Sequence, residues 1–148
     1  MSPVCDPFDL QRFVDAQDGV FEQALAELKA GAKQGHWMWF IFPQFAGLGQ
    51  SATSRHFAIG SLNEAQAYLH HPILGPRLME SAEAILAWAG KRDAVSILGE
   101  IDSMKLRSSL TLFTSISDDP RFEAALDAFF EGTHDEATLA LLRRRGGI

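Results

Sequence analysis

The sequence predicts one compact, mainly α-helical domain over residues 1–148, with about six to eight helices and a short extended or irregular aromatic segment in the core. Apolar residues recur at helical spacing along most of the chain, and no segment alternates apolar and polar residues as strands do. Helix-capping patterns precede several of these segments. No linker or internal repeat divides the 148 residues, of which 47% are hydrophobic, enough for one core.

Two helices are expected in the first thirty or so residues. The first begins at Asp6-Pro7, where an N-cap residue precedes a proline at the first helical position. The second has apolar residues at positions i, i+1, i+4, i+5 and i+8, which share one helix face, and Gly31 suits the residue after a helix end. These apolar residues are Val20, Phe21, Ala24, Leu25 and Leu28.

Residues 36–45 read His-Trp-Met-Trp-Phe-Ile-Phe-Pro-Gln-Phe. Seven of these ten residues are large hydrophobes, so we expect the stretch to be buried. Periodicity does not separate a strand from a helix where every position is apolar, but the aromatic residues favour an extended or irregular segment over 36–42. Residues 43–54 contain a proline, two glycines and three hydroxyl side chains, which predicts a loop.

Further helices are expected after residue 60. Ser61 and Glu64 form a capping box that opens a helix to about Leu69, and His70-His71-Pro72 ends it. A longer helix follows over 76–88, and a short apolar segment over 94–98. The remaining helix starts are Asp102-Ser103, Asp119-Pro120 and a second capping box, Thr133-His134-Asp135-Glu136.

Charge and composition exclude several classes of protein. A net charge of −6 without a long basic run argues against a dedicated partner of double-stranded nucleic acid, and Arg143-Arg144-Arg145 suits the end of a helix. The N-terminal residues do not resemble a signal peptide, and no stretch has the ~18 apolar residues of a membrane helix. Because Cys5 is the single cysteine, intrachain disulfides are excluded, and we expect a cytoplasmic protein that does not engage membranes.

Standard catalytic and metal motifs are missing from the sequence. There is no P-loop, no Gly-x-Gly-x-x-Gly after a strand and no Gly-x-Ser-x-Gly, and Cys5 lies too near one end to be a good nucleophile candidate. The histidines lack metal-ligand spacing, so we expect no metal site and no cofactor. They are His36, His56, His70, His71 and His134.

A first candidate site lies between residues 36 and 56. A titratable imidazole beside aromatic faces, followed by glycines that let a ligand approach backbone N–H groups, suits a planar base or a sugar phosphate. The alternative is that the aromatic residues only fill the core and that His36 is a hydrogen-bonded residue at its edge. The candidate residues are His36 for catalysis and Trp37, Trp39, Gln44, Gly47, Gly49, Ser51 and Arg55 for ligand binding.

A second candidate site lies in residues 99–111. Helical spacing puts Asp102, Lys105 and Ser109 on one face, at i, i+3 and i+7, beside apolar residues that reach the core. Polar groups at such an edge are suited to acid–base or electrostatic catalysis, so Asp102 and Lys105 are candidate catalytic residues and Ser109 a candidate ligand-binding residue. The alternative is an N-cap aspartate with an ordinary surface ion pair.

Two resemblances add to this reading. Residues 36–44 with Gly47-Leu48-Gly49, residues 71–78 and residues 102–113 resemble a bacterial family of domains of unknown function whose members are often mislabelled calpastatin. That resemblance spans roughly 8–142 and implies a small, mainly helical, cytoplasmic protein without an established activity. The Asp102-x-x-Lys105 pattern, the phenylalanine-rich segment 122–130, Gly132 and the acidic pair Asp135-Glu136 are similar to the NADAR (YbiA-like) family, which implies ADP-ribose and N-glycosidic chemistry.

Two hypotheses of different classes result. In the first, a pocket between residues 36–56 and the helix of Asp102 binds a nucleotide- or ADP-ribose-like small molecule. Asp102 then stabilises positive charge or acts as a base, and Lys105 acts as a nucleophile or an electrostatic partner. In the second, the protein is a non-catalytic helical module that binds a partner protein or a small regulator. No pattern predicts an oligomeric state.

Overall fold

The computed structural model describes residues 6–145 and the side chains of residues 6–144, so Cys5 lies outside the described part of the chain. Within that part the structure has ten helices and no strand, which confirms the predicted mainly α-helical fold. There are more helices than predicted because three of them have only four or five residues. These short helices are α3 (Met38–Ile41), α4 (Ala52–His56) and α7 (Ala94–Leu98).

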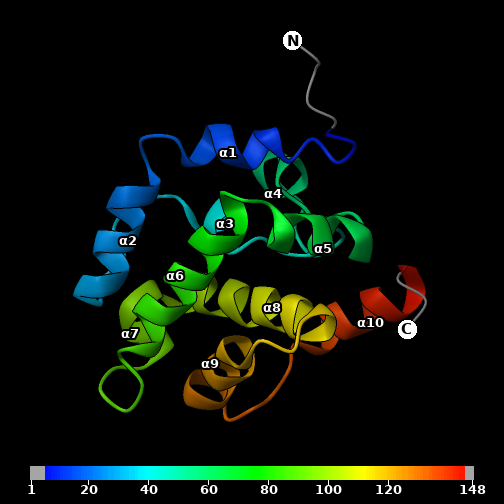
Figure 1. Ribbon diagram of the computed structural model, residues 1–148. Coiled ribbons are helices and arrows are strands. Elements are labelled where there is room, and N and C mark those ends of the chain that lie inside the picture. The colour runs from blue at the N-terminus through cyan, green and yellow to red at the C-terminus, as the bar shows by residue number, and fades with distance from the viewer. Residues whose placement is uncertain (1–5, 146–148) are drawn as a thin grey trace.

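Helix α8 is the central element of the fold. It crosses the middle of the molecule in Figure 1 and packs against α5, α7, α9 and α10. One hydrophobic core runs from Leu10 to Leu142, and α8 contributes the buried Leu106, Leu110 and Phe113 to it. The longer helices are α1 (Gln11–Gln17), α2 (Phe21–Ala30), α5 (Leu62–His70), α6 (Leu74–Leu86), α8 (Glu100–Ile116), α9 (Pro120–Phe130) and α10 (Glu136–Arg145).

The aromatic stretch in the core forms a helical turn over Met38–Ile41, so the extended or irregular conformation expected over 36–42 is wrong for its central part. In α3 the Ile41 N–H donates to the Trp37 carbonyl oxygen (3.2 Å), and the Phe42 N–H donates to the Met38 carbonyl oxygen (3.1 Å). A buried segment without a neighbouring strand must satisfy its polar backbone groups internally, which a helical turn does. The irregular part comes later, between Pro43 and Ser51.

Capping residues explain the helix starts that are predicted correctly. Ser61 Oγ accepts a hydrogen bond from the Glu64 N–H (3.0 Å), and the Glu64 carboxylate reaches back to the Gly60 N–H (2.9 Å). Asp119 caps α9 by accepting from the Arg121 N–H (3.0 Å), with Pro120 as the first helical residue.

Three predicted helix starts are wrong. Asp6 accepts from the N–H groups of Leu10 and Gln11 (2.8 and 2.9 Å), so α1 begins at Gln11 and not directly after Pro7. Helix α8 begins at Glu100, which places Asp102 inside its first turn. Helix α10 is capped by Asp135, whose Oδ2 accepts from the Thr138 N–H (3.0 Å), and not by Thr133.

Among residues 6–145, no helix combines the length and the apolar character that crossing a membrane requires.

Candidate functional site

Two adjoining cavities are lined by residues of the 44–58 segment, and together they form what we call the groove. The outer cavity, about 280 Å³, lies between the 44–54 segment and α8 and is lined by Lys105, Met104 and Ile101 among others. The inner cavity, about 120 Å³, is lined by aromatic side chains and by Arg55. Gln44, Gly49 and Ser54 line both cavities, which makes the groove continuous.

The polar centre beside the groove contains one carboxylate and two ammonium groups. Asp102 Oδ2 lies 2.8 Å from Lys33 Nζ, and Asp102 Oδ1 lies 3.4 Å from Lys105 Nζ. Because α8 begins at Glu100, with Gly99 as its N-cap residue, the Asp102 carboxylate is not used as a helix cap and remains available to the lysines. The N-cap part of the alternative is therefore wrong, whereas the i, i+3 ion pair that it also expected is present.

Lys105 connects the polar centre to the aromatic wall. Its Nζ lies 4.4 Å from the centroid of the Trp39 ring, a cation–π distance, and its side chain is 19% exposed. Trp39 is half-buried and lines the inner cavity, whereas Lys105 lines the outer one. The two segments singled out in the sequence therefore meet in space.

The segment between Phe45 and Ile59, which forms one wall of the groove, is held together at its two ends by backbone hydrogen bonds. Phe45 and Ile59 form a parallel β-bridge. In it, the Ala46 N–H donates to the Ile59 carbonyl oxygen (2.8 Å), and the Ile59 N–H donates to the Gln44 carbonyl oxygen (2.9 Å). Gly49 packs so closely on α4 that an added Cβ would lie 2.3 Å from the Ser54 Cβ. Only glycine therefore allows this wall to approach α4.

The segment carrying Lys33 is fixed by a buried carboxylate. Glu27 Oε1 accepts hydrogen bonds from the N–H groups of Gln34 (2.8 Å) and Gly35 (2.9 Å) and from the Trp37 indole (2.9 Å), and its Oε2 accepts from Gln23 (2.9 Å). Burial alone would raise the Glu27 pKa, but these hydrogen bonds outweigh it and lower the pKa from 4.5 to about 2. Glu27 is thus a buried anion that anchors the turn after α2.

The structure brings most of the predicted site residues to the groove. Trp39, Gln44, Gly47, Gly49 and Arg55 line the inner cavity, and Lys105 lines the outer one. Asp102 lies directly behind Lys105, joined to it by the ion pair.

Four predicted residues have other surroundings. His36 is exposed and lines neither cavity, and Trp37 is 1% exposed, with its indole bound to Glu27. Ser51 caps α4 through the Ser54 N–H (3.1 Å) and lies outside the linings. Ser109 is buried, and its Oγ has no hydrogen-bond partner among the described residues. For Trp37, the alternative of a core residue describes the structure better than contact with a ligand.

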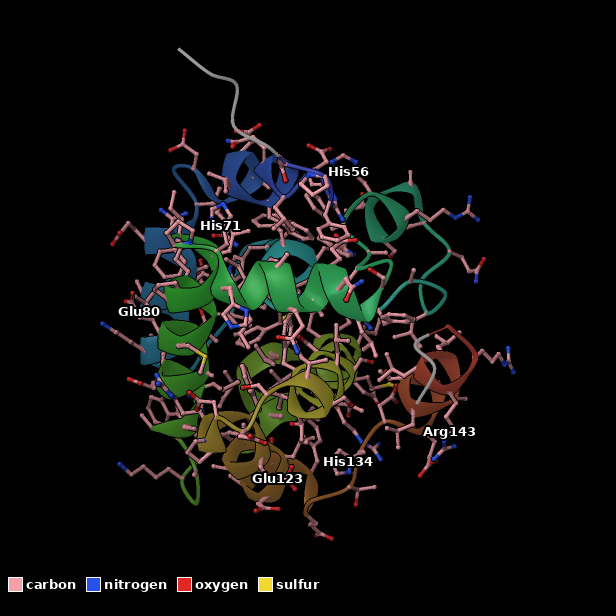
Figure 2. All side chains as sticks on the ribbon, turned by 45° about the vertical axis from the view of Figure 1, so that its right-hand side comes forward. His56, His71, Glu80, Glu123, His134 and Arg143 are labelled. Carbon is pink, nitrogen blue, oxygen red and sulfur yellow. The ribbon has the colours of Figure 1, made fainter. Side chains whose placement is uncertain are left out.

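The histidines are dispersed over the surface. Figure 2 shows His56, His71 and His134 at separate places on the molecule, and His134 pairs with Glu123 at 3.6 Å. Within residues 6–145, no group of three or more His, Cys, Asp or Glu side chains is arranged to hold a metal ion.

Comparison with known proteins identifies the family but not an activity. The family model described as a protein of unknown function, DUF1810, matches residues 7–142. The chain belongs to this family. No curated protein matches it significantly.

The DUF1810 fold of this chain is also found in a solved structure. The crystal structure of the conserved hypothetical protein Rv1873 from Mycobacterium tuberculosis is 47% identical in sequence, with a TM-score of 0.90. The match covers 93% of this chain and 99% of that one. The resemblance to a family of unknown function is thus confirmed, and neither description names a substrate.

Sequence reasoning missed two residues of this DUF1810 site. Lys33 is a single lysine in a short loop, so no spacing pattern points to it. Glu27 did leave a signal, because a carboxylate beside Leu28 on the apolar face of a helix needs buried hydrogen-bond donors. The identity of those donors depends on the fold.

Proposed function

We propose that the groove binds a nucleotide- or ADP-ribose-like small molecule, in which a planar aromatic group is joined to a phosphate, and that Asp102 and Lys105 act at its N-glycosidic bond. The observation that carries this proposal is the position of the Lys105 ammonium, 4.4 Å from the Trp39 ring centroid and lining the groove. A cation held beside an aromatic face suits a ligand with both an anionic and a planar part.

The two parts of such a ligand have matching surroundings. The inner cavity of about 120 Å³ has room for a single ring system next to Trp39 and Phe57. Arg55 lines the inner cavity and Lys105 the outer one, so a phosphate located where the cavities join has a cation on either side. Gly49 lines both cavities, and Gly47 lines the inner one.

The chemistry that we assign to α8 is electrostatic. We assign to Asp102 the stabilisation of positive charge that develops on a sugar carbon, or the role of a base; its carboxylate lies behind Lys105 and lines neither cavity. With Lys33 and Lys105 beside it, however, the group of three has a net charge of +1 when all are ionised, which favours Lys105 as the partner of a phosphate. The similarity of the Asp102-x-x-Lys105 pattern to the NADAR family makes ADP-ribose the first probe.

Isothermal titration calorimetry with ADP-ribose, NAD, AMP and adenosine tests the binding proposal. We expect the phosphate-bearing probes to bind and adenosine to bind at least tenfold more weakly. Lys105→Met should lower the affinity for ADP-ribose at least tenfold, whereas the matched control Lys91→Met, in an exposed loop outside the groove, should leave it unchanged. If none of the probes binds the wild-type protein, or if both variants bind like wild type, the proposal is wrong.

Chromatography tests the chemical part separately. Hydrolysis of the N-glycosidic bond of NAD consumes one water and releases nicotinamide and ADP-ribose. We expect wild-type protein to release nicotinamide and Asp102→Asn to release at least a hundredfold less. Binding without release would reduce the proposal to a small-molecule binding protein.

A second candidate function is a non-catalytic module that binds a partner protein. It is favoured by Ile101 and Met104, which are 72% and 65% exposed at the outer edge of the groove. The two functions are distinguished by the calorimetric titrations above, because a module that binds only a partner protein should bind none of the four probes.

A further inference from the structure

Lys33 lies behind the groove and is almost fully buried. Its side chain is 8% exposed and lines neither cavity. The ammonium group contacts Asp102 Oδ2 (2.8 Å) and the Gly35 carbonyl oxygen, and it lies 5.0 Å from the centroid of the Trp37 ring. A buried ammonium group needs such partners, and these contacts hold the Lys33 side chain in one position.

The backbone around Lys33 is anchored on both sides. The Lys33 N–H donates to the Ile97 carbonyl at the end of α7 (2.8 Å). The next two residues donate their N–H groups to Glu27, as described above. Lys33 therefore does not follow Asp102 passively, since its own segment is fixed to α2 and α7.

Asp102 divides its two oxygens between the two lysines. The shorter contact is with Lys33 (2.8 Å), and the contact with Lys105 is longer (3.4 Å) and uses the other oxygen. An N–O distance of 3.4 Å is beyond the usual range of a strong charge-assisted hydrogen bond. Lys105 is consequently held near Asp102 without being fully engaged by it.

We infer that Lys33 is a positioning residue: it binds Asp102 so that the Lys105 ammonium stays beside Trp39, ready for an anionic group in the groove. For the ligand, this inference rests on the proposed function. The inference also has a part that involves no ligand and does not depend on the proposed function: Lys33 determines how strongly Asp102 pairs with Lys105. Without Lys33, the carboxylate has Lys105 as its remaining cation in this centre and draws it into a closer pair.

Acylation of lysines by a small activated ester, measured residue by residue by mass spectrometry, tests the ligand-free part. Lys33→Met should lower acylation of Lys105 at least threefold relative to Lys91, because a tightly paired ammonium reacts slowly. Lys33→Arg should keep acylation near the wild-type rate. The double variant Lys33→Met/Asp102→Asn should restore it, since the competing carboxylate is then neutral.

Restored acylation of Lys105 in the double variant distinguishes a positioning role of Lys33 from a purely structural one. If Lys33 only maintains the fold, the second substitution adds damage and restores nothing. Asp102→Asn alone should raise acylation of Lys105, and this variant decides the matter if Lys33→Met fails to give a wild-type circular dichroism spectrum. Unchanged acylation of Lys105 in folded Lys33→Met, or in Asp102→Asn, would overturn the inference.

Affinity for ADP-ribose provides the second readout. We expect Lys33→Met to weaken binding at least fivefold although Lys33 does not line the groove, and Lys33→Arg to bind within twofold of wild type. If wild-type protein binds no ADP-ribose while the acylation pattern is as expected, the proposed function fails and the positioning role stands. If binding is present in wild type and unchanged in folded Lys33→Met, the positioning role fails and the proposed function stands.

Discussion

Two cation–carboxylate clusters join distant parts of this chain, and they differ in how completely their donors are used. Arg12 of α1 binds Glu64 of α5 at 2.8 Å and also binds four backbone carbonyl groups. Each of its five N–H groups thus has a partner, and the second Glu64 oxygen accepts from the Gly60 N–H. The four carbonyl groups belong to Phe8, Asp9, His56 and Ala58.

The cluster around Asp102 is built the other way. There two ammonium groups share one carboxylate, and the outer one, Lys105, is the more weakly paired and lines the groove. A saturated cluster such as that of Arg12 can only hold the structure together, whereas a cation with spare donors can bind something else. The comparison points to stability as the role of the first cluster, and it supports the ligand binding that we propose for the second.

The largest expected effect is on the saturated cluster. Arg12→Met should lower the free energy of unfolding by about 3 kcal/mol, because it leaves a buried carboxylate and several carbonyl groups without donors. Urea unfolding followed by circular dichroism measures this. Arg55→Met is the matched control, since Arg55 is exposed and should change stability by less than about 0.5 kcal/mol. Equal effects of the two substitutions would break the comparison.

A second large effect concerns Glu27, which supports the Lys33 segment. Its pKa is about 2 in the folded protein and 4.5 in the unfolded chain, so ionisation favours folding above pH 4.5, and the gain is lost as the pH falls towards 2. The shift corresponds to at most about 3 kcal/mol. Urea unfolding at pH 5.5 and pH 3 should show a smaller loss in Glu27→Gln than in wild type. Identical losses would show that Glu27 does not titrate as described.

A moderate effect separates the two lysines of the Asp102 cluster. Lys33→Met should lower the free energy of unfolding by about 1–2 kcal/mol, because Lys33 is the more buried and more closely paired ammonium. Lys105→Met should cost less than about 1 kcal/mol, as expected for a partly exposed and loosely held pair. Chemical unfolding of the two variants under the same conditions checks this order. The reverse order would make Lys105 the structural cation of the cluster.

The smallest expected effect is at the rim of the groove. Ile101→Ser should change the free energy of unfolding by less than about 0.5 kcal/mol, because this side chain is 72% exposed. Thermal unfolding is sufficient to check it, with Leu106→Ala, a fully buried neighbour on α8, as the contrasting variant that costs about 2–5 kcal/mol. A large loss in Ile101→Ser would show that the rim is covered by another part of the chain.

Local sequence signals predicted much of the fold. Gly31, with φ of 72°, ends α2 as expected, and Asp119-Pro120 starts α9. These features depend on neighbouring residues and are visible in the sequence. The turn at α3 was missed because, with apolar residues at every position, periodicity carries no information about conformation. Asp102 was open to a cap interpretation because the true helix start, after Gly99, lacks a capping side chain.

In the candidate site, too, the contacts within one helix could be predicted from the sequence, whereas those between distant segments could not. Asp102 and Lys105 are three residues apart on one helix, so their pairing was predictable. The contact of Lys105 with Trp39 and that of Asp102 with Lys33 depend on how α8 packs against the first part of the chain. No local rule gives these contacts, which is why Trp37 and Trp39 looked equivalent although one is core and the other lines the groove.

The bridge between Phe45 and Ile59 has a consequence for how relatives of this protein can diverge. Because the Phe45–Ile59 bridge joins the two ends of the intervening segment, residues 46–58 can change while their ends stay fixed. Arg12 secures the returning end of this segment by donating to the backbone carbonyl groups of His56 and Ala58, so the anchor does not depend on the side chains of those two residues. Insertions or substitutions within residues 46–58 would therefore change the shape of the groove while leaving the helices outside this segment in place.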